Sequence, residues 1–333
     1  MAEVKKQVYN KFVTKEKWAK VNPSNKEYME DYIMELVAQQ KKDSTIAQYK
    51  NDLKIILVYV LEELNNNDIT DLTRKNFRKF TIEMTNKGMS NARVNRLLSA
   101  LRTFLTYLSE DDEIDYDFNS SRIKGLPKEE VRDIVFIDDE DVLKLYDSFM
   151  ALGKFREALA LGILYDTGAR KNEILQISRS VIKKNTGVTN TVIGKRGKKF
   201  KLTYGRLTRE AFAKLEEKRT DDYDCLFLNR DGKPMDAASF YNMVSGFTKP
   251  LAVLTTKDYT GLNVHTLRHS YIQNLKDGTH YYCRELFNGA LPLDKIQLLA
   301  HHSDISTTQG YCKDESESEI AALFGLDADL LER

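Results

Sequence analysis

The sequence predicts a mainly helical protein of two domains, with a small β-sheet in the second domain. Apolar residues recur at helical spacing in the first hundred positions, and an acidic, polar stretch follows at residues 110–127. A glycine-flanked, strand-like segment then interrupts the helices near residue 195. A chain of 333 residues is long enough to give each domain its own core.

The first domain is predicted to consist of helices. Ser44 or Thr45 can cap a helix that runs to Leu64, a second helix covers residues 73–86, and a third begins after Ser90. Basic side chains on the last two helices form a candidate DNA-contacting surface: Arg74, Lys75, Arg78, Lys79, Arg93 and Arg96. Ordinary solvated helix faces remain the alternative.

The boundary between the domains is predicted at residues 120–133. The acidic stretch ends in K-G-L-P, which suits a tether better than a helix or strand. We therefore expect four segments: an N-terminal extension (1–26), a helical DNA-binding domain (27–120), a linker (121–133) and a second domain (134–333).

The second domain is predicted to mix helices with a β-hairpin. Helices are expected at residues 139–149 and 155–165, and again from residue 237 onward. Residues 190–203 predict a hairpin with Gly194 and Gly197 in its turn, and residues 226–228 predict a further short strand.

Composition favours a reduced, cytoplasmic protein. No apolar run reaches the roughly 18 residues of a membrane span, and the N-terminus lacks a secretory signal. The net charge is +1, but acidic runs at residues 110–117, 138–141 and 314–319 hold 14 of the 50 acids. The remainder therefore carries 51 − (50 − 14) = +15, which leaves room for a basic DNA-binding surface.

The later part of the chain holds one candidate for each role in cleaving a phosphodiester without a metal ion. A tyrosine can attack phosphorus, arginines can fork onto phosphate oxygens, and a lysine or histidine can move protons. The candidates are Arg170, Lys195, His265, Arg268, His302 and Tyr311. His265 and His269 are four apart, a zinc-compatible spacing, but no third ligand follows, so we expect neither metal nor cofactor.

These motifs resemble, in order, those of the tyrosine recombinase family, which includes phage integrases and the Xer recombinases. T-G-A-R-K-N-E-I resembles the first arginine box, V-I-G-K-R-G-K-K the lysine hairpin, H-T-L-R-H-S-Y the second box and L-A-H-H-S-D-I-S-T-T-Q-G-Y the final box. The resemblance covers residues 27–320 and implies a helical, SAM-like core-binding domain followed by an α+β catalytic domain.

The resemblance also implies a role for each site residue. Arg170 and Arg268 would bind the scissile phosphate, with Glu173 supporting Arg170. Lys195 would be the general acid, with Lys198 as the fallback because a hairpin register can slip. His265 would assist proton transfer and Tyr311 would be the nucleophile. The family's histidine lies nine positions before its tyrosine, which selects His302 rather than His301. The other basic residues of the hairpin would contact DNA: Arg196, Lys198 and Lys199.

Two features depart from the family pattern. His301 stands where the family usually has glycine, so an imidazole lies at a tightly turned backbone. About ten extra residues, around T-H-Y-Y-C-R-E-L-F-N-G-A, separate the second box from the final one. The insertion is expected to shift how His302 and Tyr311 approach the phosphate.

Two functions follow from the resemblance. The first is a site-specific recombinase of a phage or mobile element, which would bind double-stranded DNA as a dimer or tetramer and would not need a membrane. The second is a DNA-binding regulator on the same scaffold, since the chain also resembles the recombinase-like repressors of SP-beta-type Bacillus phages. We expect the chain in the cytoplasm, associated with the nucleoid when bound to DNA.

Overall fold

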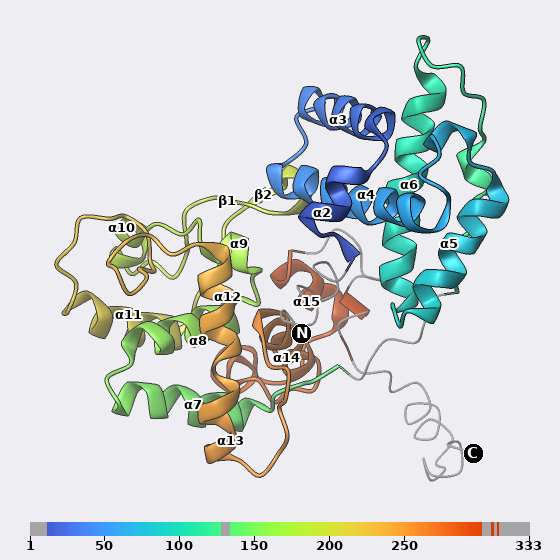
Figure 1. The fold of residues 1–333 in the computed structure, drawn as a ribbon. Coiled ribbons are helices and arrows are strands. Elements are labelled where there is room, and N and C mark those ends of the chain that lie inside the picture. Colours follow the sequence, from blue (N-terminus) through green and yellow to red (C-terminus); the bar gives the residue numbers. More distant parts are fainter. Residues whose placement is uncertain (1–11, 128–133, 302–307, 310–311, 313–333) are drawn as a thin grey trace, which may run out of the picture. The chain divides into compact units, whose positions relative to one another are not determined.

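The protein consists of two compact units, Met1–Val131 and Arg132–Arg333, each with its own hydrophobic core (Figure 1). The structure is a computed structural model that describes residues 12–127, 134–301, 308, 309 and 312. Over these residues it is mainly helical and contains a single two-stranded sheet. None of the helices in the described part is long and apolar enough to cross a membrane.

The first unit is built entirely from helices in its described part. Its α-helices are α2 (Lys15–Lys20), α3 (Pro23–Ala38), α4 (Asp43–Glu63), α5 (Arg74–Asn86) and α6 (Asn91–Glu110), with short 3-10 turns η1 (Ile69–Asp71) and η2 (Ser120–Arg122). The helix predicted to be capped by Ser44 or Thr45 begins earlier, at Asp43. Lys42 occupies the N-cap without a side-chain bond, and Asp43 places a carboxylate in the first turn, where the helix dipole favours it.

Helix α4 lies at the centre of the first unit. It packs against α2, α3 and α6, and almost every residue from Leu53 to Val60 is buried. A helix that is apolar on all sides needs neighbours all round it. α6 supplies one of them through the apolar face predicted from the sequence, and Ser90 caps its N-terminus by accepting from the Arg93 backbone N–H.

The second unit carries the remaining elements. In chain order they are α7 (Asp139–Ala151), α8 (Phe155–Thr167), α9 (Lys171–Ile174), α10 (Arg179–Lys183), β1 (Val192–Ile193), η3 (Lys195–Gly197), β2 (Lys199–Phe200), α11 (Arg206–Glu216), α12 (Ala237–Ser245), α13 (Thr248–Leu254), α14 (Val264–Lys276), the π-turn η4 (Cys283–Phe287) and α15 (Leu293–Leu299). Helix α8 is central, since every residue from Ala158 to Thr167 is buried and α7, α11, α12 and α14 pack around it (Figure 1).

The predicted hairpin is confirmed. Strands β1 and β2 are antiparallel, with Val192 opposite Phe200, and the turn between them uses the left-handed conformation at Arg196 (φ 60°) and Gly197 (φ 76°). The strand predicted at residues 226–228 is wrong for the described chain, where only isolated bridges join Cys225 to Ser178 and Leu228 to Pro234.

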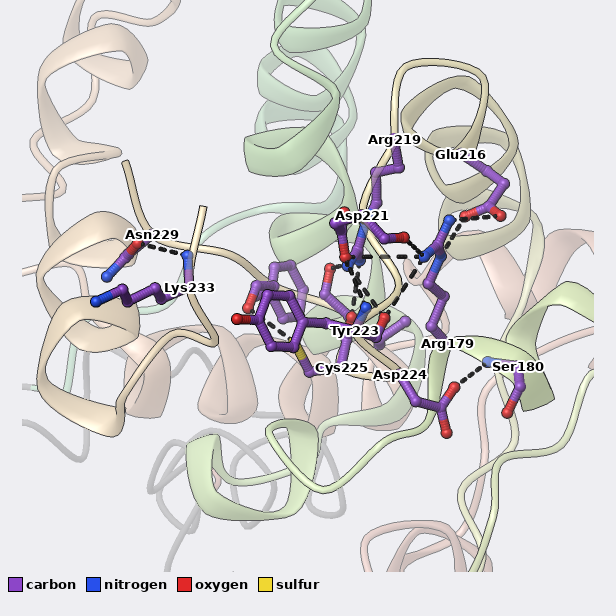
Figure 2. Close-up of polar contacts among 12 residues, drawn as sticks. Arg179, Ser180, Glu216, Arg219, Asp221, Tyr223, Asp224, Cys225, Asn229 and Lys233 are labelled. Carbon is purple, nitrogen blue, oxygen red and sulfur yellow. Dashed lines mark hydrogen bonds and ion pairs between the residues drawn. The ribbon is translucent and has the colours of Figure 1, made fainter. Parts of the chain in front are cut away.

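Side chains, rather than a strand ladder, hold the loop after α11. Arg179 at the start of α10 pairs with both carboxylate oxygens of Glu216, at 2.8 and 3.0 Å, and donates to the Asp221 carbonyl at 2.7 Å (Figure 2). Arg219 forks onto the Asp221 carboxylate in the same way and lowers its pKa to about 2. These arginines therefore tie α10, α11 and the following loop together.

The extra residues between the second and final boxes form part of the core. His280, Tyr281 and Tyr282 are buried, and Asp166 of α8 accepts from the Tyr281 hydroxyl. Asp139, in the second predicted acidic run, is also buried and accepts from the Tyr281 backbone N–H at 2.9 Å. The insertion is thus anchored to α7 and α8 by buried carboxylates.

Candidate functional site

The first box lies in a turn that only glycine can make. Helix α8 ends at Gly168, whose φ of 58° lies in the left-handed region. A Cβ added there would be 2.3 Å from the Tyr271 ring of α14, so the close approach of α14 also excludes a side chain. The chain reverses through Ala169 and places Arg170 at the N-cap of α9.

A buried carboxylate holds Arg170. Glu173, whose side chain is 3% exposed, accepts from the Arg170 backbone N–H at 2.8 Å and pairs with its Nη1 at 3.1 Å. The Arg170 side chain itself is 26% exposed. Charge-assisted bonds of this kind fix a guanidinium in direction as well as in position. The arginine therefore reaches the surface in a defined orientation.

Arg268 joins the first box, the second box and the end of α15. It lies on α14 and is 2% exposed. One guanidinium nitrogen, Nη1, donates to the Gly168 carbonyl, and Nη2 donates to the Ala300 carbonyl at 2.8 Å. Both acceptors are neutral, so these two bonds orient the guanidinium without cancelling its charge.

His265 lies in the first turn of α14 and is exposed to solvent on one side. Partial burial lowers its pKa, and the charges of Arg268, Arg170 and Lys171 lower it further. The imidazole therefore shares an electrostatic environment with both predicted phosphate-binding arginines. His269, the other half of the zinc-compatible pair, packs edge-on against Phe136.

The hairpin approaches the first box through Gly194. A Cβ at this position would lie 3.2 Å from Glu173 Oε1 and 2.7 Å from the Phe200 ring. Lys195, the next residue, is exposed at the turn, and within the described residues no hydrogen bond or ion pair holds its side chain. The predicted general acid, Lys195, therefore directly follows the glycine that lies against the carboxylate of Glu173.

The hairpin contacts the final box through Lys198, the alternative general acid. Lys198 donates from Nζ to the His301 carbonyl at 3.1 Å. His302 and Tyr311 lie outside the described residues. Of their neighbours, His301 is half-buried, Thr308 is buried, and Cys312 packs partly buried against the core of the same unit.

The basic residues predicted to contact DNA fall into two groups. Those on α5 and on the hairpin are exposed: Arg74, Lys75, Arg78, Lys79, Arg196, Lys198 and Lys199. Arg93 and Arg96 on α6 instead both bind the buried Asp52, at 2.7 and 3.0 Å. Burial lowers the pKa of Arg93, and its side chain is only 24% exposed, whereas 44% of Arg96 is exposed. Asp52 was not singled out from the sequence, because nothing local marks an acid on α4 as the partner of α6.

The sequence also did not indicate the role that three further residues play in organising the site. Gly168 and Gly194 matter because they leave room for Tyr271 and for Glu173, and Phe200 matters because it packs on Gly194 and on the His301 ring. The glycines were visible as parts of their motifs. Phe200 carried only the weak signal of an aromatic residue among five basic residues in a hairpin.

Comparison with known families decides the assignment. A sequence model described as the phage integrase family matches residues 126–318. The chain belongs to this family. A second model, described as the phage integrase N-terminal SAM-like domain, matches residues 9–111 of this integrase-family chain. The resemblance to tyrosine recombinases that the motifs predicted is thereby confirmed.

Individual relatives of this integrase-family chain are Xer recombinases. Tyrosine recombinase XerD of Listeria monocytogenes serotype 4b (strain F2365) is 29% identical over 297 residues, which cover 85% of this chain and 92% of the relative. Tyrosine recombinase XerC of Bacillus subtilis (strain 168) is 27% identical over 256 residues, which cover 74% and 78%.

Solved structures share the fold. A lambda integrase dimer bound to a COC′ core site superposes with a TM-score of 0.63 at 16% identity, covering 87% of this chain and 77% of that one. XerH bound to its difH substrate gives a TM-score of 0.59 at 21% identity, covering 88% and 83%. The predicted fold class, a helical SAM-like domain followed by a catalytic domain with a small sheet, is therefore confirmed.

Proposed function

We propose that this chain is a site-specific DNA recombinase of a phage or mobile element that cuts and rejoins DNA through a phosphotyrosine. The observation that carries the proposal is the convergence of Arg170, Arg268 and His265 where α8, α9 and α14 meet. Two guanidiniums beside a histidine suit the charge that develops on a phosphate under attack.

The chemistry needs one nucleophile and one acid. Tyr311 Oη attacks the phosphorus and loses its proton to His265, with His302 beside the phosphate. The bond from phosphorus to the 5′-oxygen breaks, and that oxygen takes a proton from Lys195. A 3′-phosphotyrosine and a free 5′-hydroxyl result, and the reverse step reseals DNA. Arg170 and Arg268 hold the non-bridging oxygens throughout.

Both units would contact the duplex. We propose residues 27–120 as the core-binding domain, 121–133 as the linker and 134–333 as the catalytic domain, after an extension at residues 1–26. The exposed basic residues of α5 and of the hairpin supply phosphate contacts, and Arg96 adds the exposed part of its guanidinium. Since the lambda integrase neighbour is a dimer bound to a core site, we propose that this chain also binds DNA as a dimer or tetramer.

The proposal is tested by trapping a covalent complex. A duplex recovered from random-sequence DNA by retention on the protein is nicked at successive positions, so that cleavage near a nick releases a short strand and blocks resealing. We expect a protein–DNA band on a denaturing gel with the natural chain and none with Tyr311→Phe, because the phenol oxygen is the attacking atom.

The same assay separates the recombinase from a regulator on the recombinase scaffold. Retention that weakens steeply with salt, without a covalent band at any nick position, would contradict the recombinase and favour the regulator. A band of equal intensity with Tyr311→Phe would instead remove Tyr311 from the mechanism.

A further inference from the structure

His301 occupies a backbone conformation that its side chain does not favour. Its φ of 53° lies in the left-handed region, where a Cβ is strained and glycine is not. The residue ends the last turn of α15, with its N–H donating to the Leu298 carbonyl at 3.1 Å. Glycine would relieve this strain, but it would also lose every contact that the imidazole makes.

Those contacts come from the hairpin. The His301 imidazole stacks on the Phe200 ring of β2, with centroids 4.1 Å apart and planes inclined by 19°. Lys198, two residues before Phe200, donates to the His301 carbonyl at 3.1 Å. Phe200 therefore holds the ring of His301, and Lys198 holds its backbone.

The same segment is also held by the second box. Arg268 donates to the carbonyl of Ala300, directly before His301. Burial lowers the pKa of His301, and the charges of Lys198 and Arg268 lower it further while Glu173 raises it. The ring therefore lies close to the hairpin lysine, the second-box arginine and the first-box glutamate together.

We propose that His301 is a positioning residue: its ring docks the β1–β2 hairpin onto the end of α15 and so sets where Lys195 lies relative to the final box. The β1–β2 ladder pairs two residues on each strand, and the bond from the Thr189 N–H to the Leu202 carbonyl, at 2.9 Å, extends the pairing at the base of the hairpin. Stacking on His301 gives it an anchor beyond that ladder. The backbone strain at His301 is the cost of that anchor.

Native proteolysis tests the docking without DNA. The hairpin offers trypsin five sites, after Lys195, Arg196, Lys198, Lys199 and Lys201. We expect His301→Gly to raise the rate of cleavage at these sites roughly fivefold, the equivalent of one aromatic pair, while the melting temperature stays equal or rises. Phe200→Leu should speed cleavage at least as much, since Phe200 also packs on Gly194. The double variant should be no faster than Phe200→Leu alone, because the contact with His301 is already lost there.

Two further variants distinguish the effect of the His301 ring from the effect of its backbone conformation. His301→Phe keeps a ring at the same φ and should restore protection of the hairpin. Gln40→Gly relieves an equivalent left-handed residue (φ 54°) in the first unit and should leave the hairpin unchanged. Unaltered cleavage in His301→Gly, or failure of His301→Phe to protect, would overturn the proposal.

A second readout concerns catalysis and rests on the proposed function. On the nicked duplex, His301→Gly should lower the rate of covalent complex formation about tenfold at saturating DNA with little change in DNA affinity, and His301→Phe should recover most of it. A full rate in His301→Gly would contradict the positioning role. Absence of the complex in the natural chain would instead count against the proposed function, while the proteolysis result would still decide the docking.

Discussion

Arg268 illustrates what a motif tells about a residue and what it does not. Its place in H-T-L-R-H-S identified it as a phosphate-binding candidate, but its burial depends on carbonyls contributed from 100 and 32 positions away. The residues around Arg268 in the sequence do not indicate such contacts. The structure therefore adds a structural role to the proposed catalytic one, since Arg268 ties α8, α14 and α15 together.

Replacing Arg268 by alanine should accordingly affect both stability and cleavage. The variant leaves a cavity and two carbonyls without their donor, so we expect a loss on the order of 3 kcal/mol in the free energy of unfolding. Urea unfolding followed by circular dichroism measures it, with the exposed Arg78→Ala as the control, expected within about 0.5 kcal/mol of the natural chain. Covalent complex formation should also be lost. An unchanged unfolding curve would show that the two carbonyl bonds contribute nothing.

At the scale of elements, local patterns predicted helices and turns well and side-chain networks poorly. The hairpin followed from the glycines and the strand-like composition of residues 190–203. The strand expected at residues 226–228 did not form, and Arg219 instead donates to the Cys225 and Leu226 carbonyls, at 2.7 and 3.0 Å. Arg93 was predicted to contact DNA, and nothing in the sequence indicated that it also pairs with Asp52 on a neighbouring helix. Which side chains pair between two helices depends on how the helices pack, and the spacing of apolar residues in the sequence does not indicate this.

The insertion between the second and final boxes contains a buried histidine whose hydrogen bonds fix its state. His280 is fully buried, its Nδ1 accepts from the Tyr282 N–H at 3.0 Å, and its Nε2 lies 3.2 Å from the Tyr165 carbonyl. The ring is therefore neutral, with its proton on Nε2. Burial lowers its pKa from 6.5 to about 4, with Asp139 opposing the shift and Arg284 adding to it.

This shift predicts a loss of stability in acid. Above pH 6.5 the imidazole is neutral in both folded and unfolded chains and contributes no pH dependence. Between pH 6.5 and 4 only the unfolded chain takes up the proton, so the free energy of unfolding should fall by about 3 kcal/mol. Urea titrations of the natural chain and of His280→Gln across this range measure the difference. Parallel curves for the two proteins would contradict it.

At the scale of the whole molecule, the two-domain mainly helical fold was predictable because each unit has its own periodic apolar pattern. The order of the four motifs in the sequence was enough to indicate the family. The near-neutral net charge was misleading, since part of the acidic count is buried: Asp139 and Asp141 are core residues with hydroxyl and cationic partners. Such acids do not oppose DNA at the surface.

The measurement that tests the central claim most directly is the identity of the residue joined to DNA. The covalent complex is digested with nuclease and trypsin, and the nucleotide-bearing peptide is sequenced by mass spectrometry. Tyr311 is the sole tyrosine between the trypsin sites at Lys295 and Lys313, so this peptide identifies it unambiguously. We predict that the nucleotide is on residues 296–313, at Tyr311. A nucleotide on any other peptide, or none on any peptide, would contradict the account.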